Sequence, residues 1–212
     1  MATEGEQNSP ASTPRARKRE ATRKRVIDSA RQLFMTEGYQ GTTIRDIARG
    51  AGVAVGSVFT TFASKGEILA EVMRARVDPL YGELDRVMPH LRGPTVDRLR
   101  TMFAIHVAFE AQHARLFLSH IAAAYDWTVT AGARPYGQDA RLKGMVRHAF
   151  ATGVEMGDIR TDADLDDLVA LVMAAFAWTF RMMAVEGTDA AAVTKVLDRQ
   201  IGLIVEGARP QG

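Results

Sequence analysis

The stretch that decides the fold is residues 42–65, which read TTIRDIARGAGVAVGSVFTTFASK. Its first half carries apolar side chains at three- and four-residue spacing, as a helix with one buried face does: Ile44, Ile47, Ala48 and Ala51. Gly52 then supplies a tight turn. A second short stripe follows at Val55, Val58 and Phe62. Two short helices joined by a glycine turn are the pattern of a helix-turn-helix.

Capping signals mark where the helices begin. Thr43 is followed three residues later by Asp46, a capping box in which Asp replaces the usual Glu or Gln. Ser64 and Glu67 repeat the signal in its regular form, so a further helix should begin at Ser64. Its apolar stripe resumes beyond Pro79, which predicts a kinked continuation to about residue 88. A helix over about residues 22–37, stopped by a glycine, precedes the quoted stretch.

Residues 23–73, about a quarter of the chain, resemble the DNA-binding domain of the TetR family of transcriptional regulators. The residues that carry the resemblance are Leu33, Phe34, Gly38, Tyr39, Thr42, Thr43, Ile47, Ala48, Ala51, Gly52, Val53, Gly56, Phe62, Ser64, Lys65 and Leu69. It implies an all-α protein of about nine helices. An N-terminal three-helix helix-turn-helix domain would bind DNA, and a C-terminal helical domain would bind a ligand and dimerise.

Basic residues gather on the same part of the chain. Residues 15–66 hold eleven Lys and Arg against four Asp and Glu, although the net charge of the whole chain is only +2. That concentration is the electrostatic footprint of phosphate binding. The tract RARKREATRKR at residues 15–25 is either an added phosphate or minor-groove contact or a solubilising tail.

The composition excludes several classes of protein. The absence of cysteine removes disulfides, thiolate catalysis and cysteine zinc sites, and it is compatible with the cytoplasm. The longest apolar run, at residues 168–180, is shorter than the roughly 18 residues that span a bilayer, so we expect no membrane segment. No G-x-S-x-G, P-loop, G-x-G-x-x-G or H-E-x-x-H spacing occurs. We therefore expect no enzyme and no cofactor.

Composition also indicates the domain organisation. Residues 1–14, rich in Ser, Thr, Pro and Gly, should be a disordered tail. Residues 15–66 should hold the basic arm and the DNA-binding domain, and residues 67–212 the effector-binding and dimerisation domain. In that second part, stripes at helical spacing predict helices at about 95–111, 116–125, 139–155, 163–186 and 189–206.

The resemblance also implies which residues contact double-stranded DNA. Thr43 and Lys65 lie at helix N-termini, where backbone N–H groups favour an anion, and Arg45 can reach a phosphate or a base edge. The second helix of the motif contributes Val55, Gly56, Ser57, Phe59, Thr60 and Thr61. The chain departs from the family pattern at Ala54, where a capping Ser is common, and at Phe59, where Tyr is common.

The second half of the chain holds most of its aromatic and Met residues, which in a helical domain usually form the core. The resemblance implies a cavity for an unidentified small-molecule effector, apolar or aromatic, lined by Met102, His106, Phe109, Phe117, Phe150 and Phe176. It also implies a homodimer through residues 163–186 and 189–206. The alternative for those two helices is an intramolecular core.

A set of polar residues leaves a metal site open as an alternative. His106, Glu110 and His113 fall at i, i+4 and i+7, and His120 follows one heptad later, so one straight helix could present a transition-metal site. A helix break near Gln112 would separate these ligands and leave His106 and Glu110 as a simple polar pair, which we favour. We therefore predict no metal.

These observations predict a sequence-specific DNA-binding protein, and the resemblance implies a repressor that a small molecule releases. The alternatives are a regulator without an effector and a metal-responsive regulator that uses His106, Glu110 and His113.

Overall fold

The computed structural model describes residues 13–112, 114, 116, 117, 119, 140–186 and 189–210, without the side chains of 180, 181 and 183–186. Within these residues the secondary structure is helical, with nine α-helices and no strand. The chain divides into two compact units, Met1–Ile68 and Leu69–Gly212. The tail predicted at residues 1–14 lies almost wholly outside the described residues, as does the helix predicted at 116–125, apart from three positions.

The first unit contains α1 (Pro14–Thr36), α2 (Gly38–Gly41), α3 (Ile44–Ala51) and α4 (Val55–Phe59). Helix α1 begins about eight residues earlier than predicted, so the basic arm is part of a regular helix. The reason lies at its start, where Thr13 accepts a hydrogen bond from the Ala16 N–H at 3.3 Å and Pro14 occupies the first helical position. The four-residue α2 was not predicted.

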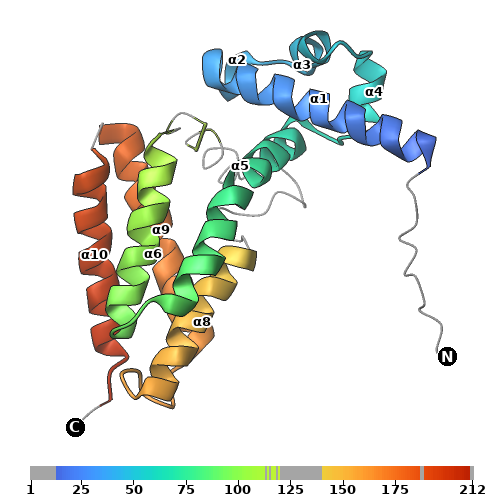
Figure 1. Ribbon diagram of the computed structural model, residues 1–212. Helices are drawn as coiled ribbons and strands as arrows, with labels where there is room; N and C mark the ends of the chain where they lie inside the picture. The colour runs from blue at the N-terminus through green and yellow to red at the C-terminus, as the bar shows by residue number, and fades with distance from the viewer. Residues whose placement is uncertain are drawn as a thin grey trace, which may run out of the picture. The chain divides into compact units, whose positions relative to one another are not determined.

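The core of the first unit lies between α1 and the helix pair α3–α4, which run along one side of α1 (Figure 1). Helix α1 buries Val26, Ala30 and Phe34 on this side. The apolar side chains of the quoted stretch meet it: Ile47, Ala48, Ala51, Val58 and Phe62 are all buried. The predicted apolar face of the helix-turn-helix is therefore confirmed except at Ile44 and Val55, which are only half-buried.

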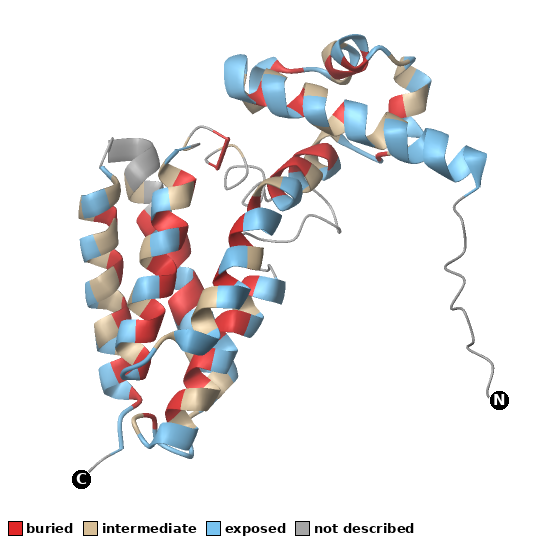
Figure 2. Cartoon of the chain, in the orientation of Figure 1, coloured by how far each residue is buried: buried red, intermediate tan, exposed pale blue. Residues whose placement is uncertain are grey.

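The second unit is built from most of α5 (Lys65–Val87), the 3₁₀ turn η1 (Met88–His90), α6 (Thr95–Ala111), α8 (Ala140–Met156), α9 (Leu165–Glu186) and α10 (Ala190–Gly207). Helix α5 continues through Pro79 as predicted. Helix α10 packs on α6 and α9, and α8 packs on the same two helices. Figure 2 shows the buried residues of these helices on the sides that face one another. No helix among the described residues is long and apolar enough to cross a membrane.

The connection Gly157-Asp158-Ile159-Arg160 joins the ends of several helices of the second unit. Gly157 ends α8 in the left-handed conformation, with φ 79°. Asp158 then accepts hydrogen bonds from the Thr95 N–H at 2.5 Å and the Thr95 hydroxyl at 3.0 Å, which caps the start of α6. The Arg160 N–H donates to the Ala208 carbonyl at the end of α10, at 2.9 Å. The capping group that the preceding Pro94 cannot supply therefore comes from a distant turn.

Candidate functional site

The helix-turn-helix is fixed by a complete capping box and a left-handed glycine. Thr43 accepts a hydrogen bond from the Asp46 N–H at 3.2 Å, and the Thr43 N–H donates to the Asp46 carboxylate at 3.1 Å. The Thr43 hydroxyl and N–H, with Arg49, hold the pKa of Asp46 below its usual range. Gly52, with φ 63°, then turns the chain.

Helix α4 presents a small, weakly polar surface. Gly56 and Thr60 are exposed and Phe59 is 57% exposed, while Val55, Ser57 and Thr61 are half-buried. The hydroxyls of Thr60 and Thr61 donate to the Ser57 carbonyl at 3.0 and 2.9 Å, so their oxygens still have free lone pairs. No side chain caps the start of α4 at Ala54. The predicted surface residues of the second helix thus lie on α4 and the two residues that follow it.

The three remaining predicted DNA contacts differ in whether their side chains already bond to other protein groups. Arg45 is exposed and has no ion-pair partner among the described residues. The Thr43 hydroxyl already donates to Asp46 at 2.5 Å. The Lys65 amine donates to the carbonyls of Tyr39 and Thr42 at 2.7 and 3.0 Å and lies 4.2 Å from the centre of the Tyr39 ring. Burial lowers the pKa of Lys65. Lys65 therefore ties the segment before α3 to α5, a structural role that the sequence did not indicate.

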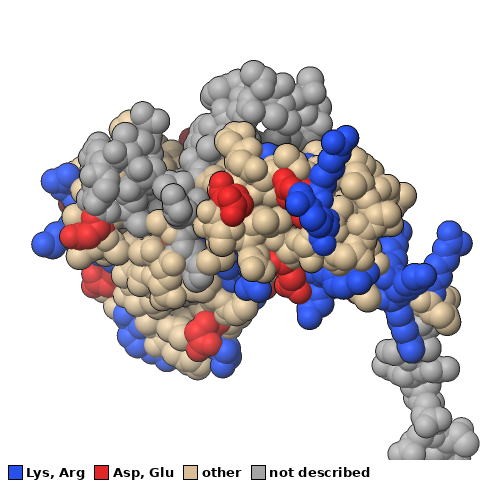
Figure 3. All heavy atoms as spheres, turned by 90° about the horizontal axis from the view of Figure 1, so that it is seen from above, with Lys and Arg blue, Asp and Glu red and all other residues tan. Residues whose placement is uncertain are grey.

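Basic side chains dominate the beginning of α1, where Figure 3 shows lysine and arginine gathered. The exposed residues of that tract include Arg15, Arg17, Lys18 and Arg19. Further along, the Arg23 guanidinium lies 5.0 Å from the centre of the Phe62 ring, so this part of the helix also covers the core. One helix therefore presents a cationic end and a packed middle.

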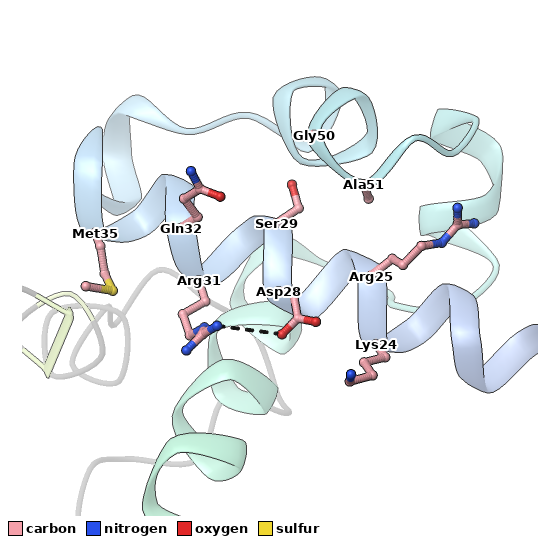
Figure 4. Close-up of a pocket in the computed structure, with 9 residues that line it drawn as sticks. All are labelled: Lys24, Arg25, Asp28, Ser29, Arg31, Gln32, Met35, Gly50 and Ala51. Carbon is pink, nitrogen blue, oxygen red and sulfur yellow. Dashed lines mark ion pairs between the residues drawn. The ribbon is translucent and has the colours of Figure 1, made fainter.

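An open groove of about 820 Å³ lies between α1 and the end of α3 (Figure 4). The side chains and backbone that line it are Lys24, Arg25, Asp28, Ser29, Arg31, Gln32, Met35, Gly50 and Ala51. The two helices approach closely at Gly50, because an added Cβ there would collide with the Ser29 hydroxyl. Ser29 donates to the Ile47 carbonyl at 3.0 Å. The groove contains none of the DNA contacts predicted within the helix-turn-helix, although Lys24 and Arg25 belong to the basic tract, and we assign it no ligand.

The residues predicted to line an effector cavity lie mostly in the interior of the second unit. Met102, His106, Phe117, Phe150 and Phe176 are buried and Phe109 is half-buried. The Phe176 ring lies 4.8 Å from both the Phe103 and the His106 rings, centre to centre. The structure therefore brings part of this set, His106 and Phe176, into one aromatic cluster with Phe103.

Three polar residues are buried beside that aromatic cluster. Arg76 of α5 forms an ion pair with Glu110 of α6, and the His106 Nε2 lies 3.4 Å from a Glu110 carboxylate oxygen. The side chains of Arg76, Glu110 and His106 are 8%, 1% and 2% exposed, respectively. Sequence reasoning missed Arg76. The signal that could have found it was its place on the apolar stripe of α5, four residues after Val72 and four before Leu80.

The metal alternative receives no support from the described residues. Helix α6 ends at Ala111 with Gln112 as its C-cap, as predicted, and Glu110 is paired with His106 and Arg76. Within the described ranges, no group of three or more His, Cys, Asp or Glu is placed to hold a metal ion. His113 and His120 lie outside those ranges.

Comparison with known proteins identifies the family. The model described as bacterial regulatory proteins, tetR family, matches residues 26–72. The HTH-type transcriptional repressor KstR2 of Mycobacterium tuberculosis is 30% identical over 147 residues, which cover 66% of this chain and 70% of that protein. The chain belongs to the TetR family. Like the proteins it matches, this TetR-family chain is a DNA-binding transcriptional regulator and not an enzyme.

Solved structures agree with the TetR fold. Thermus thermophilus FadR, a TetR-family repressor in complex with lauroyl-CoA, matches with a TM-score of 0.72 at 20% identity, covering 90% of this chain and 96% of that one. RolR in complex with resorcinol matches with a TM-score of 0.69, also at 20% identity, covering 92% of this chain and 91% of that one. The all-α prediction, with an N-terminal helix-turn-helix and a C-terminal helical domain, is confirmed.

Proposed function

We propose that this TetR-family regulator represses transcription as a homodimer, by inserting α4 of each protomer into successive major grooves of a pseudo-palindromic operator. The observation that carries the proposal is the exposed face of α4, formed by Gly56, Phe59 and Thr60 in a strongly basic unit. Residues 15–66 would form the DNA-binding domain and residues 67–212 the effector-binding and dimerisation domain. The place of action would be the cytoplasm.

The mode of DNA contact follows from the groups that remain free to bond. Arg45 and the backbone of α4 can approach bases and phosphates, and Ser57, Thr60 and Thr61 offer hydroxyl oxygens. The phenol that the family resemblance implies is absent at Phe59, and Lys65 is engaged with carbonyls. We therefore assign a larger share of the phosphate binding to the basic start of α1.

Operator binding tests this proposal. Selection of bound fragments from random duplex DNA, followed by fluorescence anisotropy, should yield a palindromic site bound by the full chain. Removal of residues 1–19 should flatten the dependence of log K on log salt by about 0.9 for each phosphate that the arm had neutralised. A full chain that binds every duplex alike would refute a sequence-specific regulator, whereas an unchanged salt slope would refute only the role of the arm.

The surface of α9 and α10 supports the dimer. Leu171 and Trp178 lie one heptad apart on α9, with exposed Ala174 between them, and all three share the exposed face of that helix. Leu203 of α10 is 70% exposed. Large apolar side chains that are exposed in one chain fit the centre of an interface with a second copy. Sedimentation equilibrium should give a dimer for the wild type and a monomer for Leu171→Glu; a monomeric wild type would refute the interface.

The aromatic interior of the second unit supports an effector of apolar or aromatic character, which would release the operator by favouring another conformation. Two proteins of similar fold, FadR and RolR, are in complex with lauroyl-CoA and resorcinol, respectively. An effector that releases DNA must bind the two conformations unequally. A thermal-shift screen followed by anisotropy would show both properties. A compound that raises the melting temperature without weakening operator binding would contradict release by that compound.

A further inference from the structure

The buried cluster of Arg76, Glu110 and His106 has more hydrogen-bonding groups than partners. Glu110 is satisfied, because it accepts from Arg76 Nη2 and lies within 3.4 Å of His106 Nε2. The Nε and Nη1 atoms of Arg76 and the Nδ1 atom of His106 are buried and have no hydrogen-bond partner among the described residues. Buried polar atoms in folded proteins are nearly always paired, so these three mark a place where another molecule bonds.

The surroundings of the cluster are apolar and aromatic. The Arg76 guanidinium lies 4.9 Å from the centre of the Phe109 ring. The His106 ring lies 4.8 Å from the Phe176 ring and 5.7 Å from the Tyr81 ring, centre to centre. A group that reaches the unpaired atoms must therefore belong to a molecule whose remaining surface suits aromatic walls.

The charges and donors of the cluster indicate what that group is. Arg76 and Glu110 carry opposite charges and already form an ion pair, so a ligand carboxylate would bring an unbalanced negative charge into the interior. A neutral oxygen brings none. The two free N–H groups of Arg76 need an acceptor. If His106 donates its Nε2–H to Glu110, its Nδ1 is an acceptor and needs a donor. A hydroxyl has both an acceptor and a donor.

We infer that the effector is a neutral, largely apolar molecule that carries a hydroxyl group, and that Arg76 and His106 bind its oxygen and hydrogen. This inference rests on the proposed effector function and deepens it by naming the chemical class. It also connects the ligand to the DNA-binding unit through the chain itself, since Arg76 lies on α5, whose first residue is Lys65. Lys65 in turn bonds the carbonyls just before α3.

Three probes that share a propylphenyl body test the chemical class of the effector. Para-propylphenol carries a hydroxyl, propylbenzene carries no polar group, and para-propylbenzoate carries a carboxylate. Thermal shifts of the full chain, without DNA, give an affinity for each. The phenol should bind about tenfold more tightly than propylbenzene, as expected for one or two hydrogen bonds in a buried site. It should also bind more tightly than the benzoate. Equal affinities, a preference for the benzoate, or no shift with the phenol would overturn the inference.

A double variant shows whether the cluster is responsible. In Arg76→Met with Glu110→Leu both charges are removed together, so no unpaired charge is left behind and the fold should persist. The preference for the phenol should disappear in this variant. It should persist in the matched control, Glu83→Gln with Arg86→Gln, which removes an exposed ion pair of α5. A preference that survives in the double variant would show that the hydroxyl is recognised elsewhere and would overturn the role of the cluster.

A second substitution separates the bond that His106 accepts from the bonds that Arg76 donates. His106→Phe keeps an aromatic ring against Phe176 and removes the Nδ1 acceptor, so the phenol should lose affinity while para-propylanisole, which has no hydroxyl hydrogen, should not. Equal reductions in affinity would overturn the role of His106. Because these measurements use no operator, they remain distinct from a failure of the regulator proposal, which would appear as absent sequence-specific DNA binding.

Discussion

The two units of this chain place their polar side chains in opposite ways. In the DNA-binding unit, the helix-capping pairs join near neighbours at the surface, as Thr43 does with Asp46 and Ser64 with Glu67, whereas Lys65 bonds carbonyls 23 and 26 residues away. In the second unit, the decisive pairs are buried or half-buried and join residues far apart in the chain, as Arg76 does with Glu110 and Thr95 with Asp158. Surface pairs tolerate removal because water replaces them, whereas interior pairs do not. Four substitutions compare the two units further, two at polar side chains and two at glycines.

The largest effect should follow from breaking the buried ion pair on one side only. Glu110→Ala leaves the Arg76 charge in the interior, and a buried charge without its partner costs about 3–5 kcal/mol. Urea denaturation followed by circular dichroism should show that loss of unfolding free energy. The control in the DNA-binding unit is Asp28→Ala, whose partner Arg31 is exposed, with an expected loss of about 0–1 kcal/mol. Equal losses for the two variants would remove the contrast between the units.

The next effect concerns a close approach between helices of the second unit. A Cβ at Gly153 would lie 2.6 Å from Ile159 and 2.9 Å from the Asp158 carboxylate, and it would also strike the Thr95 hydroxyl. Gly153→Ala should destabilise the chain by about 1–3 kcal/mol, because three partners must move. Gly144→Ala, on the same helix with open space around it, should be neutral or stabilising by up to about 1 kcal/mol. A neutral Gly153 variant would contradict the packing described.

A glycine of the DNA-binding unit should show the opposite effect on stability, a gain on substitution by Ala. Gly56 of α4 has open space around it, so Gly56→Ala should raise stability by up to about 1 kcal/mol through helix propensity. The added methyl would stand on the face proposed to approach DNA, and operator affinity should fall about tenfold, equivalent to about 1.4 kcal/mol. Anisotropy measures the affinity, with Gly82→Ala of α5 as the control that keeps it. Unchanged affinity would place the interface elsewhere.

The smallest effect is a pH dependence. Hydrogen bonds from Thr43 lower the pKa of Asp46 below its usual 3.8, so its contribution to stability is complete above that value and is lost as pH falls through the folded-state pKa. Asp46→Asn should therefore melt lower than the wild type at pH 6, and the gap should shrink toward pH 2. A gap of constant size would show that the carboxylate charge does not matter.

How far the sequence predicted this molecule depends on the range over which residues act. The capping box, the turn at Gly52, most of the apolar face of α3 and the bounds of α6 follow from residues within a few positions of each other, and the predictions for them were right. The four-residue α2 carries no periodic signal because it is little longer than one turn. The carbonyls that bind Lys65 lie 23 and 26 residues away, which no local pattern can reveal.

The candidate sites show the same limit. The residues predicted around α4 come from one continuous stretch, and the structure places them close together. Their contact with DNA stays a proposal. The effector residues were predicted as an apolar set, and the aromatic contacts of His106 agree with that character. The partner that changes the chemistry, Arg76, stands on another helix, 34 residues from Glu110. Only the folded chain brings them together.

The turn at Asp158 has a mechanical consequence for the second unit. Its carboxylate holds the first residue of α6, and its neighbour Arg160 holds the end of α10, so helices distant in the chain are fastened at one end of the bundle. Helices held together at one end can separate only at the other end. We therefore expect this turn to act as the hinge if a ligand separates the helices of the second unit. Hydrogen exchange of the Thr95 and Arg160 amides should therefore be equally slow with and without para-propylphenol. Faster exchange on binding would show that the hinge lies elsewhere.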